Sequence, residues 1–259
     1  MDLFSFSPLV LFSFLLTLMR VSLVVFLLPF YGGDTLPAMV KVFICLVLTM
    51  ALWPHLSFPG EILPAHPGGI ALILLGELIL GLMLGLCVAF IFAGIQTGGE
   101  IMGFQMGFTM VTLADPFSGA QVSISSHLLY MVALMIFLTL DGHLVLLRGL
   151  ADSFALVPPG GLRVGGNLTG SVLELSAAMF SVAVQIAGPI LAALFLVELA
   201  LALMGRAAPQ MNLLTLGFPL KIAVGFFFIG MIFSLVALRM EDTILEMGPL
   251  FNNLMRRGS

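Results

Sequence analysis

The stretch GIALILLGELILGLMLGLCVAFIFAGI, residues 69–95, decides the fold class of this 259-residue chain. It contains a single charged side chain, Glu77. Its length exceeds the roughly 18 apolar residues that separate membrane spans from buried core helices. Because unpaired backbone groups are costly in lipid, a solid apolar run of this kind is helical, whereas a barrel strand would alternate strictly. We therefore predict an α-helix surrounded by lipid or by other apolar protein.

The composition of the whole chain agrees with this stretch. Hydrophobic residues make up 61% and charged residues 8%, and the mean hydropathy is +1.22, whereas a soluble domain has about 25% charged residues. The formal net charge of -4 is small and spread along the chain, so no basic surface indicates nucleic-acid binding. We predict an all-α, multi-helix integral membrane protein that contacts lipid.

Long apolar segments recur along the sequence, and Pro, Gly and the few charges separate them. At about 1.5 Å of rise per residue each could cross a hydrocarbon core of about 30 Å. We find no internal repeat, and predict one membrane domain over residues 1–259 with helical hairpins. The six predicted segments are about 8–30, 38–56, 69–96, 124–148, 172–205 and 216–238.

Two places break the apolar pattern in an unusual way. Residues 97–126 mix several glycines with Phe and Met side chains, which predicts a flexible backbone that carries bulky apolar groups. Asp141-Gly142-His143 is typical of a turn or a helix interruption rather than of an acid/base pair, because helical positions two apart do not face each other.

Ionisable residues inside the segments are candidate functional groups, because each costs about 2.5–3.5 kcal/mol at the centre of a span. Arg20, Glu77 and Glu198 fall in this class, and Glu100, which lies just before Gly103, is a candidate proton sensor. They form either a proton or ion path or a set of ion pairs between helices. Three scattered charges make a poor relay, so we favour ion pairs.

Small residues follow Glu77 at every fourth position: Gly81, Gly85, Ala89 and Ala93. Such spacing lets another helix approach closely along one face. We predict that this segment packs on a helix of this chain or of another subunit.

No catalytic or ligand-binding pattern is present in the sequence. The four histidines are dispersed, Cys45 and Cys87 have no partner at metal-ligand spacing, and there is no HExxH motif, GxSxG elbow or Walker A loop. We predict a protein that is not an enzyme and that holds no metal or cofactor.

Two blocks are denser in Gly, Pro and polar side chains than a simple connection requires. The first block comprises Gly103, Phe104, Gln105, Met106, Gly107 and Phe108, with Met110, Asp115 and Pro116 after it. The second comprises Arg206, Pro209, Gln210, Asn212, Gly217, Pro219 and Lys221. The two prolines of the second block lack a backbone N–H, which leaves nearby carbonyl groups free to accept hydrogen bonds from Gln, Asn and Lys side chains of this or another chain.

At these two blocks the chain resembles the FliR family of flagellar type III secretion, whose counterpart in the virulence injectisome is the T subunit. The resemblance covers essentially the whole chain. It implies a subunit of an export gate in the bacterial inner membrane, within the flagellar basal body. FliP-like and FliQ-like subunits and FlhB-like and FlhA-like proteins are the implied partners, and unfolded flagellar proteins pass through. Residues 1–170 are expected to be similar to a P subunit and residues 171–259 to a Q subunit.

The resemblance also implies that residues 103–116 plug the pore. The side chains suit that role, since Phe104, Met106, Phe108 and Met110 can fill an irregular apolar constriction and the glycines let the segment yield. The alternative function is a secondary transporter or ion channel, with Arg20, Glu77 and Glu198 as coupling residues. A transporter often shows two matching halves, which this sequence lacks.

Overall fold

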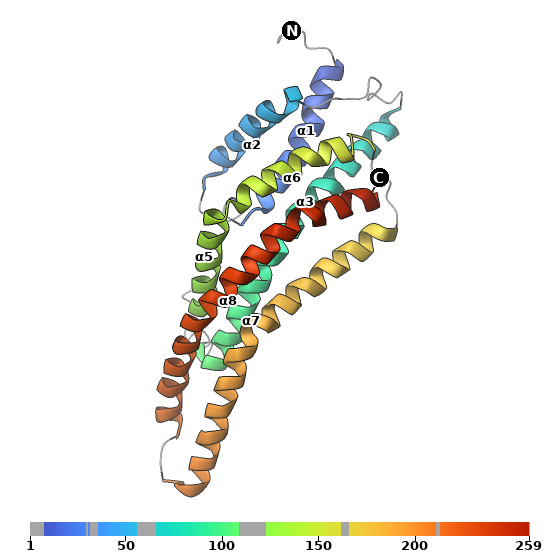
Figure 1. Cartoon of the computed structure of the whole chain (residues 1–259). Helices are drawn as coiled ribbons and strands as arrows, with labels where there is room; N and C mark the ends of the chain where they lie inside the picture. Colours follow the sequence, from blue (N-terminus) through green and yellow to red (C-terminus); the bar gives the residue numbers. More distant parts are fainter. Residues whose placement is uncertain are drawn as a thin grey trace. The chain divides into compact units, whose positions relative to one another are not determined.

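The protein is all-α, as the sequence predicts. The computed structural model describes residues 8–29, 31, 36–55, 66–108, 123–161, 166–210 and 213–258, and these residues contain no strand (Figure 1). The long helices are α1 (Pro8–Leu27), α3 (Pro67–Met106), α7 (Gly166–Ala207) and α8 (Leu213–Gly258). The shorter ones are α2 (Ala38–Leu52), the 3-10 helix η1 (Trp53–His55), α5 (Ile124–Thr139) and α6 (Gly142–Leu156).

The six apolar segments correspond only approximately to spanning helices. Helices α1, α3, α7 and α8 are long and apolar enough to cross a membrane, and the bent pair α5 and α6 adds a fifth if it counts as one span. Helix α2 has 15 residues, which is about 22 Å of rise against about 30 Å of hydrocarbon. The helix formed within the predicted segment 38–56 is therefore shorter than a full span.

The predicted segment 124–148 is not one straight helix. Helices α5 and α6 meet at an angle of 67°, and Asp141 between them adopts the left-handed conformation with φ 55°. A residue in this conformation cannot continue a right-handed helix, so the chain turns here. The predicted interruption at Asp141-Gly142-His143 is confirmed.

The prediction of a flexible backbone from residue 97 onwards is wrong for its first ten positions, because α3 continues without a break to Met106. Glycine disfavours a helix through its backbone entropy and because it exposes the backbone to water. Gly98, Gly99 and Gly103 are buried in α3, where neighbouring helices cover the backbone. Residues 109–122 lie outside the described part of the chain.

Helix α8 also extends far beyond the predicted segment 216–238. Arg239, Glu241 and Asp242 end the continuous apolar run, and hydropathy alone places the segment's end there. The helix continues as an amphipathic one, whose buried residues are Met240, Ile244, Met247, Phe251 and Met255. Their spacing of three or four positions is that of one helix face.

The chain divides into two compact units, and the boundaries between them fall inside α3, α7 and α8 and between α5 and α6. Unit 1 comprises residues 1–90, 141–175 and 243–259. Unit 2 comprises residues 91–140 and 176–242.

In unit 1, α3 packs against α1 through Gly81 and Gly85. A Cβ atom on Gly81 would lie 2.9 Å from the Cβ of Leu23, and one on Gly85 would lie 2.7 Å from the Cβ of Leu27. Those distances are shorter than van der Waals contact, so the two helices approach this closely only because both positions are glycine. Ala89 and Ala93, further along the same register, are half-buried.

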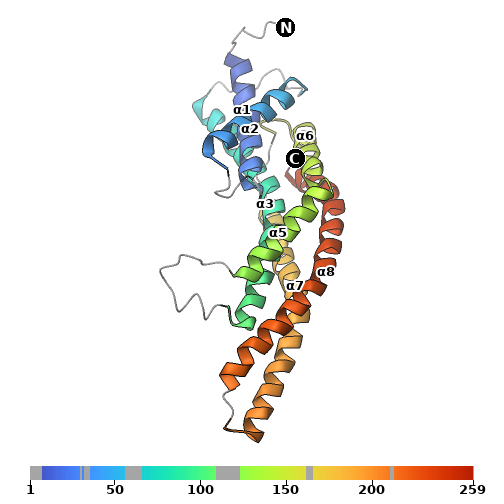
Figure 2. The same cartoon turned by 90° about the vertical axis from the view of Figure 1, so that its left-hand side faces the viewer.

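In unit 2, two further pairs of glycines bring α3 close to two other helices (Figure 2). A Cβ on Gly94 would lie 2.8 Å from the carbonyl oxygen of Met179 in α7, and one on Gly98 would lie 3.0 Å from that of Ala183. On the α5 side, a Cβ on Gly99 would lie 2.5 Å from the Cα of Ser126, and Gly103 lies against Ser123 and Ser125. Each glycine pair has a spacing of four, which is one turn of helix.

The glycine contact between α3 and α1 predicts a large effect of a very small substitution. Gly85→Ala should destabilise the protein by about 1–3 kcal/mol, because the added methyl group meets the Cβ of Leu27 and one backbone must move. The measurement is thermal unfolding of the detergent-solubilised protein.

Gly230→Ala in α8 is the matched control, since nothing lies within 4 Å of the added Cβ. This variant should be as stable as the original chain or more so, because Ala favours a helix over Gly by about 1 kcal/mol. Equal melting temperatures for the two variants would contradict the close packing of α1 on α3.

Candidate functional site

The first candidate block forms the end of α3. Gly103, Phe104, Gln105 and Met106 make up its last turn, and Gly107 ends the helix with φ 89°. A left-handed residue directly after the last turn is a common helix stop, and glycine adopts it without strain. Met106 is fully buried, whereas Phe104 is 68% exposed. The end of α3 therefore presents one large apolar ring outward and anchors another apolar side chain inward.

Helix α8 covers one side of this end with apolar groups. The side chain of Met106 lies on Gly225, where an added Cβ would collide with it, and Gly107 lies against the ring of Phe218. The rings of Phe108 and Phe226 meet edge to face, with centroids 5.9 Å apart. We call this contact the α3–α8 joint.

Helix α5 holds the other side of α3 through serine side chains. The hydroxyl of Ser125 donates to the carbonyl oxygen of Gly99 at 2.9 Å, and that of Ser126 donates to the carbonyl oxygen of Gln96 at 3.0 Å. Ser123 and Ser125 share a further hydrogen bond of 2.7 Å. Together with the contacts of Gly99 and Gly103 with these serines, these bonds form what we call the α3–α5 joint.

The sequence interpretation missed this joint. The signal was present, since Ser123, Ser125 and Ser126 cluster beside an apolar segment, where hydroxyl groups need partners. What the sequence does not indicate is that their acceptors lie on α3, some 26–30 positions away. The other residues of the predicted plug, Met110, Asp115 and Pro116, lie outside the described residues.

The second candidate block forms the tip of the α7–α8 hairpin. Arg206 lies in the last turn of α7, Pro209 and Gln210 follow in the turn, and Asn212 lies outside the described residues. Gly217, Pro219 and Lys221 belong to the first turns of α8. The ammonium group of Lys221 forms an ion pair with Glu198 of α7. This pair ties the two helices of the hairpin together near its tip.

Arg20 and Glu77 form a fully buried ion pair in unit 1. The guanidinium group of Arg20 donates from Nε to Oε2 of Glu77 at 2.7 Å and from Nη2 to Oε1 at 2.9 Å. The exposures of the two side chains are 0% and 1%. Two parallel hydrogen bonds between Arg and a carboxylate are a strong and directional arrangement.

Helix α6 and the residues that directly follow it supply the remaining partners of this pair. Arg20 Nη1 donates to the carbonyl and hydroxyl oxygens of Ser153, and both Nη atoms donate to the carbonyl oxygen of Val157 at 3.1 Å. The guanidinium carbon lies 4.2 Å from the centre of the Phe154 ring. The backbone N–H of Gly160 also donates to Glu77 at 3.4 Å. The network thus joins α1, α3 and α6, and each charged group has several partners.

Of the acidic residues predicted inside the segments, Glu77 and Glu198 are each paired with a cation of another helix. Glu100 differs, since it is exposed on α3, one turn before Gly103. No cluster of three potential metal ligands occurs within the described residues.

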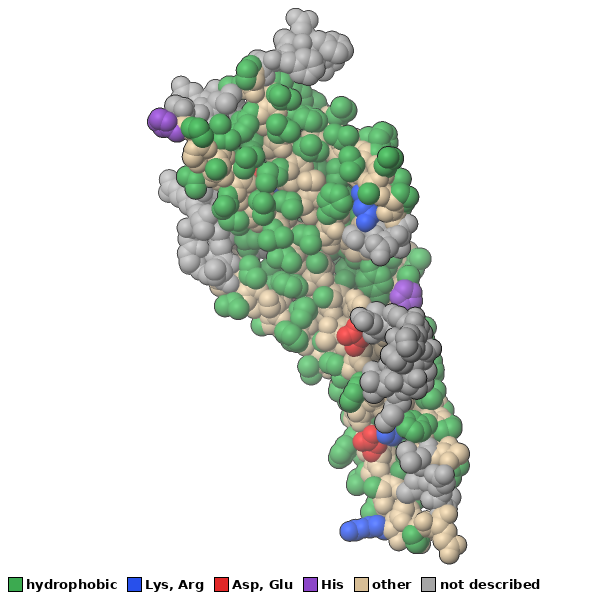
Figure 3. Space-filling model, turned by 180° about the vertical axis from the view of Figure 1, so that it is seen from behind, with side chains coloured by type: hydrophobic (Ala, Val, Ile, Leu, Met, Phe, Trp, Pro, Cys, Tyr) green, Lys and Arg blue, Asp and Glu red, His purple; other side chains and the backbone are tan. Residues whose placement is uncertain are grey.

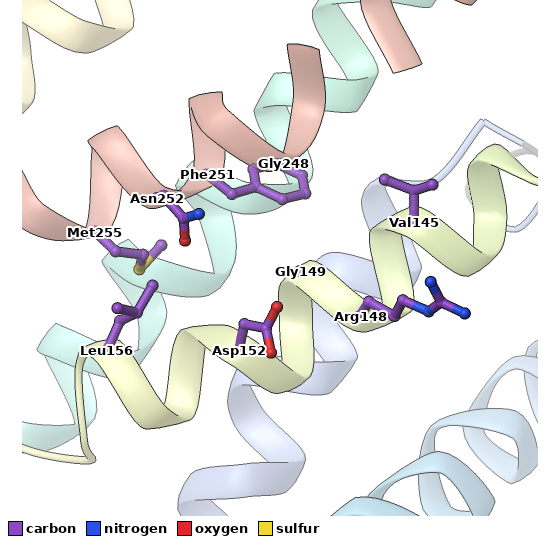
Figure 4. A pocket seen from close by; sticks show the side chains of 9 residues that line it. All are labelled: Val145, Arg148, Gly149, Asp152, Leu156, Gly248, Phe251, Asn252 and Met255. Carbon is purple, nitrogen blue, oxygen red and sulfur yellow. The ribbon is translucent and has the colours of Figure 1, made fainter. Parts of the chain in front are cut away.

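A cavity of about 210 Å³ lies between α6 and the last turns of α8, in unit 1 (Figure 4). Its floor is apolar: the ring of Phe251 lies against Gly149, and Leu156 and Met255 point toward each other (Figure 4). Exposed polar side chains stand at its rim, namely Arg148, Asp152 and Asn252. Sequence reasoning did not single out these residues.

Large apolar side chains cover much of the face that Figure 3 shows. On α7 they extend from Leu173, which is 71% exposed, to Met204. At about 1.5 Å per residue this is roughly 45 Å along the helix, compared with about 30 Å of hydrocarbon in a bilayer. Lipid alone therefore does not cover the whole length of this apolar surface.

Comparison with known proteins gives a consistent result. Residues 11–247 match the family described as bacterial export proteins, family 1. The flagellar biosynthetic protein FliR of Escherichia coli is 30% identical over 92% of this chain and 90% of its own length. FliR of Bacillus subtilis is 31% identical over 86% of this chain and 87% of its own, and FliR of Aquifex aeolicus is 27% identical over 93% of each.

The buried ion pair predicts an asymmetric mutational result. Glu77→Gln should destabilise the protein by about 3–5 kcal/mol, because it leaves the guanidinium group of Arg20 buried without a counter-charge. The double variant Arg20→Met/Glu77→Met should recover part of that loss, since no charge remains to be compensated. Thermal unfolding in detergent measures the stability of both variants.

Recovery should be incomplete, because the carbonyl oxygen of Val157 loses its donors. A double variant less stable than Glu77→Gln would contradict the packing role. A double variant that is as stable as the original chain and assembles normally, but no longer supports transport, would instead indicate that the pair carries protons or ions.

Proposed function

The chain belongs to the bacterial export proteins of family 1, and from this membership we propose that it is a subunit of the flagellar type III protein export gate. As a component of the flagellar export apparatus it is embedded in membrane, and its role is to form a passage rather than to catalyse a reaction. We place it in the inner membrane, within the basal body. There it would assemble with FliP-like and FliQ-like subunits into a plugged pore for unfolded flagellar proteins.

The observation that carries this proposal is the length of the exposed apolar surface. Helices α3, α7 and α8 have 40, 42 and 46 residues, which is about 60–70 Å of rise each, or roughly twice a hydrocarbon core. A helix with apolar side chains exposed over about 45 Å needs another cover where the lipid ends. Sister subunits with similar apolar helices supply that cover.

The division of labour within the chain follows the family resemblance. Residues 1–170 take the place of a P subunit and residues 171–259, with the α7–α8 hairpin, that of a Q subunit. FlhB-like and FlhA-like proteins complete the set of partners. The ion pair between Glu198 and Lys221 supports a hairpin that keeps its own two helices together while its outer apolar side chains contact neighbours.

The plug assignment covers residues 103–116. Two features of the described part support it. Phe104 points an exposed ring away from α3, and both sides of the helix end are held, by α5 and by α8. A closed pore must stop ions but must open for a polypeptide, and apolar contacts around Met and Phe side chains satisfy both needs without strong bonds to break.

Assembly is the first test of the proposed function. A tagged form of this chain is co-expressed with its P-like and Q-like candidates, extracted in detergent and weighed by native mass spectrometry. The expected result is one discrete hetero-complex that contains this chain. A stable homo-oligomer that forms without the P-like and Q-like subunits would contradict the gate and would favour a secondary transporter or ion channel.

Ion leakage tests the plug. Phe104→Ala should raise the ion conductance of membranes that contain the assembled gate, because it removes an apolar ring from the constriction. Proton and ion flux into vesicles measures the effect. Phe43→Ala in α2 is the matched control, since this ring is 66% exposed compared with 68% for Phe104. If both variants are as tight as the original gate, Phe104 is not part of the plug.

A further inference from the structure

The cavity between α6 and the last turns of α8 lies wholly within unit 1 and contains none of the residues assigned to the plug. On α6 its lining residues run from Val145 to Leu156 at helical spacing, and on α8 they run from Gly248 to Met255 in the same way. Residues three or four positions apart lie on one face of a helix. One face of each helix therefore borders the same space.

Two glycines in the walls of this cavity have different effects. At Gly149 an added Cβ would collide with the ring of Phe251, so this glycine admits the ring that closes the floor. At Gly248 an added Cβ would meet nothing within 4 Å, so this glycine leaves space open. The volume of about 210 Å³ is far above the roughly 10–15 Å³ that one water molecule needs. The space is large enough for part of a ligand.

The dimensions of the cavity indicate which kind of molecule it takes. Pockets that enclose a whole small molecule have volumes of about 300–1,000 Å³, so this one holds only a part of a longer apolar molecule. From Arg148 near one end to Leu156 at the other (Figure 4), α6 rises by about 12 Å. The acyl chains of one leaflet extend over about 15 Å, half of a hydrocarbon core. A single acyl chain fits this length.

The charges at the rim select the headgroup. Arg148 and Asp152 are exposed and lie about one turn apart on α6, and neither forms an ion pair or hydrogen bond with any residue that the structure describes. Asn252 of α8 adds an amide at the same rim (Figure 4). A cation and an anion side by side match a headgroup that carries both a phosphate and an ammonium group. The carboxylate of Asp152 would repel a headgroup that is only negative.

A protein partner fits this cavity less well than a lipid does. Nine residues line it, compared with about 20–30 on each side of a standard protein interface. A soluble partner would have to gain its whole binding energy from this small area. Phospholipids, in contrast, surround a membrane protein at high concentration, so the cavity needs only to select among them.

We propose that the cavity binds one phospholipid with an ethanolamine headgroup. Its acyl chain lies over the ring of Phe251 and extends toward Leu156 and Met255. The guanidinium group of Arg148 donates to the phosphate, and the ammonium group of the lipid, which carries three N–H donors, donates to the carboxylate of Asp152. The bound lipid thereby joins α6 to the end of α8. This site is independent of the passage proposed above.

The experiment measures lipid selection by the full chain. The chain is co-expressed with its P-like and Q-like candidates, purified in detergent and stripped of lipid. It then receives an equimolar mixture of phosphatidylethanolamine, phosphatidylcholine and phosphatidylglycerol with identical acyl chains. Native mass spectrometry counts the bound molecules and identifies each by its mass. The original chain should retain one phosphatidylethanolamine in preference to the other two, and equal retention of all three overturns the proposal.

Gly248→Leu fills the cavity and should abolish the retention of this one lipid. Gly188→Leu in α7 is the matched control: both glycines precede a proline inside a helix, and both have open space at the added Cβ. Any strain that a side chain before proline causes is therefore shared. Thermal unfolding checks that the two variants are equally stable. A Gly248→Leu chain that keeps the lipid, or that loses a P-like or Q-like subunit with its lipid binding unchanged, contradicts the site.

Two rim variants test the headgroup and leave the cavity itself unchanged. Asp152→Asn should reduce the preference for phosphatidylethanolamine over phosphatidylglycerol by up to about fivefold, as the loss of an exposed ion pair does. Arg148→Gln should weaken the binding of all three lipids, because each has a phosphate. Both side chains are exposed, so the fold is expected to tolerate these changes. An unchanged preference in Asp152→Asn would show that the cavity does not recognise the ammonium group, and the proposal would fail.

Discussion

Close approach of helix backbones at α3 is the constraint on which the rest of the structure depends. Gly81 and Gly85 admit α1, Gly94 and Gly98 admit α7, and Gly99 and Gly103 admit α5. In a membrane there is no hydrophobic force between helices, so van der Waals packing and polar bonds must hold them together. Both weaken steeply with distance. Glycine is the residue that allows the shortest distance, and α3 uses it against three neighbours.

Polar interactions in this protein occur where that close approach has already placed the helices. The Arg20–Glu77 pair lies within one turn of Gly81, and the remaining donors of Arg20 reach backbone oxygens in α6 and directly after it. The serines of α5 reach carbonyl oxygens of α3 beside Gly99. In each case a polar group that would be costly in lipid has its partner in the protein. These bonds select which helices are neighbours, while the apolar side chains fill the space between them.

The proposed gate uses the difference between these two kinds of contact. Unit 1 contains the buried ion pair, whose rupture would leave a charge without a partner, so its helices are held as a fixed frame. Unit 2 contains one polar joint and one apolar joint at the end of α3. A pore that opens for an unfolded polypeptide must separate some of its surfaces many times without damage. Contacts between Met, Phe and Gly meet that requirement better than bonds between charged groups.

The sequence by itself determined the fold class, the membrane environment and the family, because these depend on composition, on long apolar runs and on motifs that lie within a few residues. It also located the helix interruption at Asp141. Tertiary structure alone decided that Arg20 pairs with Glu77, 57 positions away, that α3 continues through residues 97–106, and that Ser125 and Ser126 bond to α3. Periodicity shows which face of a helix is apolar or small, but the identity of the helix against that face depends on how distant segments come together.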